Sequence, residues 1–209
     1  MTTTIHLMRH GESTVNVNRT LSGKSYEGDL TDLGREQAVK AARWLADKGI
    51  THIRHSPFHR AQQSAEIVGA ALGLSIIEDR DLCEMNSGDL HGRSDEEAWD
   101  IFMSVFVRWL QADPDARYPG GESWAEGNER MKRALAAVPR DSTTLLVTHG
   151  GIVESVIPYL CVNAAALQRT GEFFHTAFAV LEPYDEGSLV GAMSERYNCL
   201  SWNLHDHLL

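Results

Sequence analysis

Two histidines and an arginine lie at points where apolar segments of the sequence end in glycine. Arg9 and His10 follow a short apolar run and precede Gly11, and His149 follows a second run and precedes Gly150. Ligands of α/β proteins bind just beyond the carboxyl ends of the strands. There a guanidinium can bind phosphate oxygens, and a neutral imidazole can attack phosphorus. An isolated Arg-His-Gly also fits a structural ion pair beside a surface histidine, because short motifs often match by chance.

Two further residues complete the set that phosphoryl transfer requires. Arg60 lies at the start of the helix expected after a second strand, where the helix terminus adds to the attraction for anions. Glu84 lies in the loop after a third expected strand. Such a reaction needs a nucleophile, positive charge on the phosphoryl oxygens and an acid for the leaving oxygen. The five residues supply all three functions if the fold brings them together.

The elements that must position these residues alternate between strand and helix. Helical periodicity and capping residues predict helices that start near Thr31 and end by Gly49, and start at Ser56-Pro57 and stop at Gly73. We also predict strands at about 3–8, 50–55, 74–77, 143–148, 173–181 and 188–197, and helices at 94–110, 123–137 and 152–160. Successive strand–helix units predict a three-layer α/β/α sandwich with a mostly parallel central sheet. We expect residues 1–209 to form one domain, with a helical insertion over the site at about 94–137.

Composition limits the classes of partner. The chain has 209 residues and a formal net charge of −10, which argues against nucleic acid or an anionic membrane as partner. An anionic substrate must therefore be attracted by a local basic pocket. Three widely spaced cysteines, Cys83, Cys161 and Cys199, suggest no disulfide framework or metal motif. With neither a signal peptide nor a membrane-spanning run apparent, we expect a cytoplasmic protein. Whether it forms a homodimer stays open.

Six short motifs occur in an order that resembles one known family, the histidine phosphatase superfamily, also called phosphoglycerate mutase-like. They run over nearly the whole chain: Arg9-His10-Gly11-Glu12-Ser13 with Asn16; Leu30-Thr31…Gly34…Gln37-Ala38; Ser56-Pro57…Arg60-Ala61; Leu82…Glu84…Gly88…Gly92; Pro119-Gly120-Gly121-Glu122-Ser123; and Val147-Thr148-His149-Gly150-Gly151. The resemblance implies that His10 is a nucleophile that becomes phosphohistidine and that Arg9, Arg60 and His149 hold the phosphoryl group. It further implies that Glu84 protonates the leaving alcohol and later activates water. By the same resemblance, Asn16, Ser22, Gly23 and Gly150 contact the substrate.

The resemblance implies a small phosphorylated substrate and no metal or other cofactor, since arginines and an imidazolium neutralise the phosphoryl charge. His10 must be neutral to attack, whereas His149 can act protonated. We therefore expect the pKa values of the two imidazoles to differ.

Departures from the family pattern favour a phosphatase over a mutase. Cofactor-dependent phosphoglycerate mutases follow the acid glutamate with Arg-His-Tyr-Gly, whereas Met85-Asn86-Ser87-Gly88 follows Glu84 here. Their insertion carries extra basic residues, but here Arg93, Arg108 and Arg117 match no mutase motif, and a row of aromatic residues is present: Trp99, Phe102, Phe106 and Trp109. That row is either core or a wall of the substrate pocket. The alternatives are a bisphosphoglycerate-dependent mutase and a relative that binds phosphorylated ligands or partners without catalysis.

Overall fold

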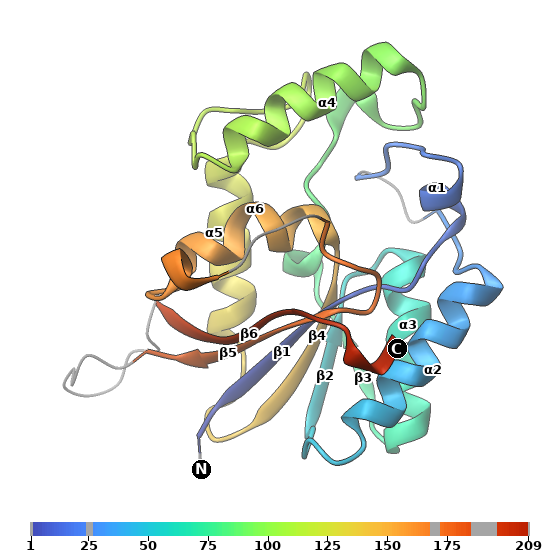
Figure 1. Cartoon of the computed structure of the whole chain (residues 1–209), viewed down its shortest axis with the longest axis vertical. Helices are drawn as coiled ribbons and strands as arrows, with labels where there is room; N and C mark the ends of the chain where they lie inside the picture. Colours follow the sequence, from blue (N-terminus) through green and yellow to red (C-terminus); the bar gives the residue numbers. More distant parts are fainter. Residues whose placement is uncertain (1, 24–26, 168–171, 185–195, 209) are drawn as a thin grey trace.

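A six-stranded sheet forms the centre of the molecule (Figure 1), with strand order β3-β2-β4-β1-β5-β6. The computed structural model describes residues 2–23, 27–167, 172–184 and 196–208. The strands are β1 (Thr4–Arg9), β2 (His52–His55), β3 (Ile76–Glu78), β4 (Thr143–Thr148), β5 (Phe178–Pro183) and β6 (Tyr197–Leu204). Strands β1 to β4 are parallel, whereas β5 is antiparallel to β1 and to β6. The sheet is therefore mixed, with a parallel part at its centre.

Alternation of side chains along the strands directs two apolar layers to opposite faces of the sheet. Ile5 and Leu7 of β1 pack with α5 (Trp124–Ala136) and α6 (Gly150–Leu160). Met8 packs on the other face with α2 (Asp32–Leu45) and α3 (His59–Leu72). Figure 1 shows these pairs of helices on either side of the sheet. The predicted three-layer α/β/α sandwich is confirmed.

The segment predicted as an insertion divides into two parts. Helix α4 (Glu96–Trp109) lies beyond the carboxyl ends of the parallel strands, over the site (Figure 1), whereas α5 packs in the apolar layer against the sheet. The remaining short elements are α1 (Thr14–Val17) and the 3₁₀ turns η1 (Arg80–Leu82), η2 (Gly88–Leu90), η3 (Ala164–Ala166) and η4 (Asp206–Leu208). Among the described residues, none of the helices is both long enough and apolar enough to cross a membrane.

Helix boundaries mostly follow the capping residues, with two differences. Thr31 caps α2 by accepting the backbone N–H of Gly34, and Gly73 ends α3 in the left-handed conformation with φ 67°. Helix α3 begins at His59, later than predicted, because Ser56 and Pro57 form a turn in which the Ser56 hydroxyl accepts the N–H of Phe58. Leu33, in the first turn of α2, is 50% exposed. The buried face of this helix is formed by other residues: Gly34, Ala38, Ala41, Ala42 and Leu45.

The predicted strand at 143–148 is confirmed as β4, whereas the boundaries predicted for three other strands need correction. Strand β3 is displaced by two residues from the prediction of 74–77, because Gly73 and Leu74 complete the turn after α3. Strand β5 begins at Phe178 instead of residue 173, and the preceding residues form a turn at the edge of the sheet. Most of the strand predicted at 188–197 lies outside the described residues, and the observed β6 begins where that prediction ends.

Candidate active site

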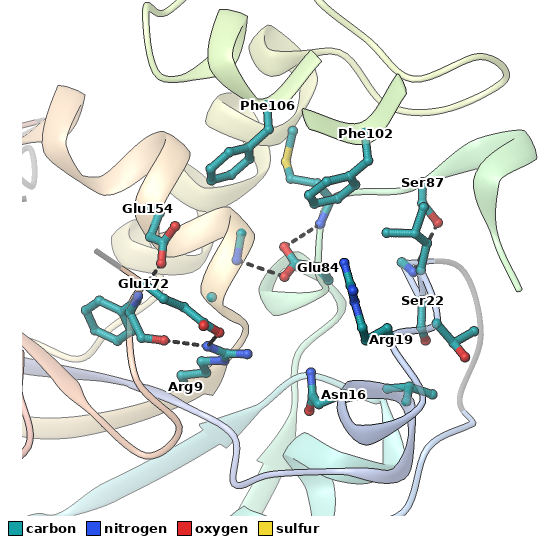
Figure 2. A pocket seen from close by; sticks show the side chains of 18 of the residues that line it. Arg9, Asn16, Arg19, Ser22, Glu84, Ser87, Phe102, Phe106, Glu154 and Glu172 are labelled. Carbon is teal, nitrogen blue, oxygen red and sulfur yellow. Dashed lines mark hydrogen bonds and ion pairs between the residues drawn. The ribbon is translucent and has the colours of Figure 1, made fainter. Parts of the chain in front are cut away.

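A cavity of about 820 Å³ opens beneath α4, at the carboxyl edge of the parallel strands. Figure 2 shows its walls, to which β1, the first turn of α6 and the loop around Ser22 contribute. Eight of the nine predicted site residues line it: Arg9, His10, Asn16, Ser22, Gly23, Arg60, Glu84 and Gly150. The ninth, His149, is fully buried next to His10, and the centroids of the two rings lie 5.1 Å apart. The fold thus brings together residues separated by up to 141 positions in the sequence, from Arg9 to Gly150.

The tautomer of His10 follows from its two hydrogen bonds. Its Nδ1 lies 2.7 Å from the carbonyl oxygen of Gly11, which can only accept, so Nδ1 carries the proton. Its Nε2 then has the lone pair, and Arg60 Nε donates to it at 3.1 Å. Burial and the nearby arginines hold the pKa of His10 well below 6.5. The imidazole is therefore neutral at physiological pH, with its nucleophilic nitrogen beside a guanidinium.

Arg60 is positioned by the first turn of α3 and by the loop after α1. Its Nη2 donates to the carbonyl oxygen of Ser22 at 2.8 Å, and its Nη1 lies 3.3 Å from the Ser22 hydroxyl. Burial lowers its pKa to about 10, so the guanidinium remains charged near neutrality. Ser22, predicted to contact substrate, thus also orients Arg60.

His149 is held from the side opposite His10. Its Nε2 lies 2.8 Å from the hydroxyl of Ser56, while its Nδ1 is buried without a hydrogen-bond partner. The Ser56 hydroxyl also accepts the N–H of Phe58; if it donates its own proton to Nε2, the ring proton of His149 lies on Nδ1. Burial and Arg60 hold the pKa of His149 well below 6.5. Burial and the arginines thus lower the pKa of both histidines, and the expected difference between the two pKa values stays a prediction.

Glu84 caps the N-terminus of α6. Its Oε2 accepts the backbone N–H of Gly151 at 2.9 Å, and its Oε1 accepts those of Ile152 at 2.7 Å and Met85 at 2.8 Å. Figure 2 shows the carboxylate at the centre of the cavity. The helix dipole and three N–H donors stabilise a negative group at this position. The predicted acid thus lies at the site, and its carboxylate is the cap of a helix.

Arg9 is held from the far side of the cavity, where residues that the sequence reasoning missed are found. Its Nη1 donates to Glu172 Oε1 at 2.6 Å and to the carbonyl oxygen of Phe173, while its buried Nε has no hydrogen-bond partner. A Cβ on Gly150 would lie 3.1 Å from that Nε, so glycine allows α6 to start against the guanidinium. A tetrahedral anion at this point would satisfy the unpaired N–H.

The loop before α2 supplies polar groups on another side. Asn16 Oδ1 accepts from the backbone N–H of Ser13 at 3.1 Å and from its hydroxyl, so the amide nitrogen turns toward the cavity (Figure 2). The backbone N–H of Gly23 donates to the Ser87 hydroxyl at 3.2 Å. A Cβ on Gly23 would lie 2.0 Å from the carbonyl oxygen of Met85, so this close approach of two loops requires glycine.

The cavity residues that were not predicted include three with titratable side chains close to Arg9: His175, Glu154 and Glu172. The ring centroid of His175 lies 5.9 Å from that of His10, and its buried Nε2 has no hydrogen-bond partner. Burial and Arg9 lower its pKa to about 3. His175 and Glu172 precede β5, and because β5 runs antiparallel to β1, its beginning lies at the edge where β1 ends. Recognising that direction would have placed them at the site.

The aromatic row of α4 serves both of the purposes considered for it. Trp99, Phe102, Phe106 and Trp109 all line the cavity, while Trp109 is also 1% exposed and packs in the core. Phe102 stacks on Tyr118 with ring centroids 5.2 Å apart. In the part of the chain that the structure describes, no group of three or more His, Cys, Asp or Glu side chains is arranged to hold a metal ion.

Comparison with known proteins agrees with this architecture. The chain is 35% identical over 172 residues to the probable phosphoglycerate mutase GpmB of Erwinia tasmaniensis, covering 77% of each. The GpmB of Escherichia fergusonii is 37% identical over 149 residues, covering 70% of this chain and 69% of that protein.

Among solved structures, mycobacterial glucosyl-3-phosphoglycerate phosphatase Rv2419c is 25% identical, with a TM-score of 0.77 over 96% of this chain and 98% of that one. Bacillus stearothermophilus YhfR shares the fold with a TM-score of 0.80 over 99% of this chain and 100% of that one, at 23% identity. A family model described as histidine phosphatase superfamily, branch 1, matches residues 5–195. The chain therefore belongs to branch 1 of the histidine phosphatase superfamily.

Proposed function

We propose that this enzyme is a metal-independent phosphomonoesterase, which hydrolyses a small phosphorylated metabolite through a phosphohistidine at His10. The observation that carries the proposal is the Arg60–His10 contact, in which the lone pair of a neutral imidazole lies 3.1 Å from a guanidinium nitrogen. A phosphoryl group bound by Arg9 and Arg60 would present its phosphorus to Nε2. The two guanidinium groups would neutralise charge on the phosphoryl oxygens.

The proposed reaction has two steps. His10 Nε2 attacks phosphorus, the N–P bond forms, and the P–O bond to the alcohol breaks while Glu84 gives that oxygen a proton. Glu84 then takes a proton from water, whose oxygen attacks phosphorus, the N–P bond breaks and phosphate leaves. Throughout, the proton stays on Nδ1, which donates to the carbonyl oxygen of Gly11, and this hydrogen bond stabilises the positive charge of the phosphorylated ring. The buried Nδ1–H of His149 would donate to a phosphoryl oxygen.

The environment of the leaving group supports a phosphatase over a mutase. The three arginines that match no mutase motif, in or next to the 94–137 segment, form ion pairs with neighbouring acids. Arg93 pairs with Asp95 and Glu97, Arg108 with Asp113, and Arg117 with Glu126. The cavity lining described above takes aromatic side chains from α4 instead. A mutase must bind a second anionic group of its substrate, and apart from Arg9 and Arg60 the described lining of the cavity offers Arg19 as the one arginine for it.

The second candidate is a bisphosphoglycerate-dependent mutase, which the identity to proteins named probable phosphoglycerate mutase favours. The two are separated by incubating the enzyme with 3-phosphoglycerate, with and without 2,3-bisphosphoglycerate, and measuring inorganic phosphate and 2-phosphoglycerate. A screen of phosphorylated metabolites in the presence of a chelator tests the rest. We expect phosphate release that survives chelation and is abolished in His10→Ala. Rapid, primer-dependent formation of 2-phosphoglycerate would instead support the mutase.

A further inference from the structure

The charges around the cavity do not balance for an ordinary phosphate ester. Among the described residues, the arginines that line it are Arg9, Arg19 and Arg60. The glutamates that line it are Glu12, Glu84, Glu154 and Glu172. A bound phosphate monoester adds roughly two further negative charges. Even with Glu84 protonated, as the proposed reaction requires, the other three glutamates and the phosphate outweigh the three arginines, so a positively charged alcohol half would improve the balance.

Two of these glutamates are committed to the protein itself. Glu12 Oε1 accepts the hydroxyl of Thr31 at 2.8 Å, and Glu84 accepts the three backbone N–H groups described above. Glu154 Oε1 accepts the backbone N–H of Phe173, and no described residue donates to its Oε2. Glu172 is 68% exposed in its side chain and binds Arg9, the residue that a phosphoryl oxygen would engage. Glu154 and Glu172 are thus available to a ligand.

The position of Glu154 on α6 indicates which part of a ligand it would meet. It lies one helical turn beyond Gly150, at the spacing that places side chains on the same helix face. Its carboxylate accepts the backbone N–H of Phe173, whose carbonyl oxygen accepts from Arg9, so an ammonium group that reaches both this carboxylate and a phosphate on Arg9 needs only a short linker. Figure 2 shows Glu154 and Glu172 together on one side of the cavity, with Arg19 on the opposite side, where its guanidinium lies 5.2 Å from the Trp99 ring. Burial raises the pKa of Glu154, while the hydrogen bond from Phe173 and the charge of Arg9 act in the opposite direction.

Two other features of the same cavity suit a cation. Phe102 and Phe106 project from α4 into it (Figure 2), and aromatic faces attract ammonium groups. Independently, Tyr118 lines the cavity, is 1% exposed, and its hydroxyl has no hydrogen-bond partner. A buried hydroxyl without a partner is costly, and a ligand N–H would satisfy its oxygen.

We propose that Glu154, assisted by Glu172, is the specificity-determining residue of this site and selects phosphate monoesters whose alcohol half carries an ammonium group two carbons from the ester oxygen. This inference rests on the proposed phosphatase function. Phosphate binding to Arg9 releases the Glu172 carboxylate, and the ammonium group then lies between two carboxylates. The same carboxylates repel substrates that carry a second anion there.

The test compares two esters of nearly equal shape, 2-aminoethyl phosphate and propyl phosphate, in which a methyl group replaces the ammonium. The proteins are the wild type, Glu154→Gln and a control, Glu66→Gln, whose glutamate is exposed on α3. In the wild type we expect kcat/KM to favour the ammonium ester by about tenfold or more. The ratio should fall close to one in Glu154→Gln and stay at the wild-type value in Glu66→Gln. A wild-type ratio near one, or an unchanged ratio in Glu154→Gln, would overturn the proposal.

A separate arm distinguishes failure of this inference from failure of the phosphatase assignment. Phosphate release from p-nitrophenyl phosphate reports catalysis without reference to an ammonium group. If none of the esters is hydrolysed, the phosphatase function is wrong, and calorimetric Kd values for the same two esters then test Glu154 directly. Glu154→Gln retains an oxygen for the Phe173 N–H, and its thermal unfolding checks the fold. Glu172→Gln should reduce the ratio less, because that side chain is mostly exposed.

Discussion

Glu84 Oε2 accepts the backbone N–H of Gly151 at 2.9 Å, so the residue expected to donate a proton caps the helix that follows His149. Protonation would weaken part of this cap, since the oxygen of a neutral carboxyl O–H is a poorer acceptor than a carboxylate oxygen. The same three N–H groups could therefore return Glu84 to the ionised form after proton transfer, ready to activate water. Capping and acid–base chemistry would then be coupled in one side chain.

Glu84→Gln tests this coupling. The amide keeps one acceptor oxygen but cannot donate a proton to the leaving alcohol. We expect alkyl phosphates to be slowed by about 10²-fold or more and p-nitrophenyl phosphate much less, because nitrophenolate leaves without a proton. Rates over a series of leaving groups measure the difference. Equal slowing of all esters would show that Glu84 does not act as the acid.

Arg60→Lys tests the contact with the nucleophile. Lysine keeps a positive charge but cannot donate to His10 Nε2 and to the carbonyl oxygen of Ser22 in one plane. We expect kcat/KM for p-nitrophenyl phosphate to fall by about 10²–10³-fold, as for loss of one preorganised donor. Arg80→Lys, at an exposed pair with Glu78, is the matched control and should retain wild-type kinetics. A small effect of Arg60→Lys would argue against its role.

The histidines of the site should titrate far below the usual range. Burial first and then Arg60 lower the pKa of both His10 and His149, so both rings are neutral above that lowered range and become charged only in stronger acid. NMR titration of the ring protons in the free enzyme, assigned with His10→Gln and His149→Gln, measures this. Either ring titrating at 6.5 or above would contradict the geometry described here.

A buried histidine outside the site, His6, should make the stability of the fold depend on pH. His6 packs against Trp44 and Phe178 with ring centroids 6.0 Å and 6.3 Å away, and burial lowers its pKa to about 4. In the unfolded chain the pKa of His6 is about 6.5, so as the pH falls the unfolded chain binds the proton before the folded one does. The contribution of neutral His6 to the free energy of unfolding is therefore present above about pH 6.5 and is lost as the pH falls towards 4.

Between pH 7 and 5 we expect His6 to account for about 1–2 kcal/mol of lost free energy of unfolding. Urea denaturation at both pH values gives the loss, which should be smaller in His6→Leu. The exposed His52 provides a control: His52→Leu should leave the pH dependence as in the wild type. An equal loss in His6→Leu and the wild type would rule out His6 as the source.

Much of the site followed from local sequence pattern. Each strand that ends in a histidine and a glycine delivers its histidine to the same edge because β1 and β4 are parallel neighbours. Arg60 was placed at that edge even though α3 starts later than expected, since the turn at Ser56 does not change the side of the sheet. These predictions depend on the direction of consecutive strand–helix units, which short-range periodicity reveals.

The residues that escaped prediction depend on long-range pairing. His175 and Glu172 reach the cavity only because β5 pairs antiparallel with β1, and nothing in the residues around Phe178 states that direction. Glu154 is a single polar residue in the middle of the apolar helix α6. Its contact with Phe173, in the segment before β5, follows from tertiary packing that the sequence of neither segment reveals. The histidine pKa values likewise depend on how completely α3 and α6 bury the rings.

The place of β1 between β4 and β5 has a consequence for synthesis of the chain on the ribosome. His10 is synthesised before the two strands that flank β1 and before His149 and His175, which all come from beyond residue 142. A nascent chain that ends before β4 cannot form the phosphate pocket, whatever helices it has already formed. The capacity to bind phosphate should therefore appear late and abruptly during translation, which protects the emerging nucleophile from reacting before its partners arrive.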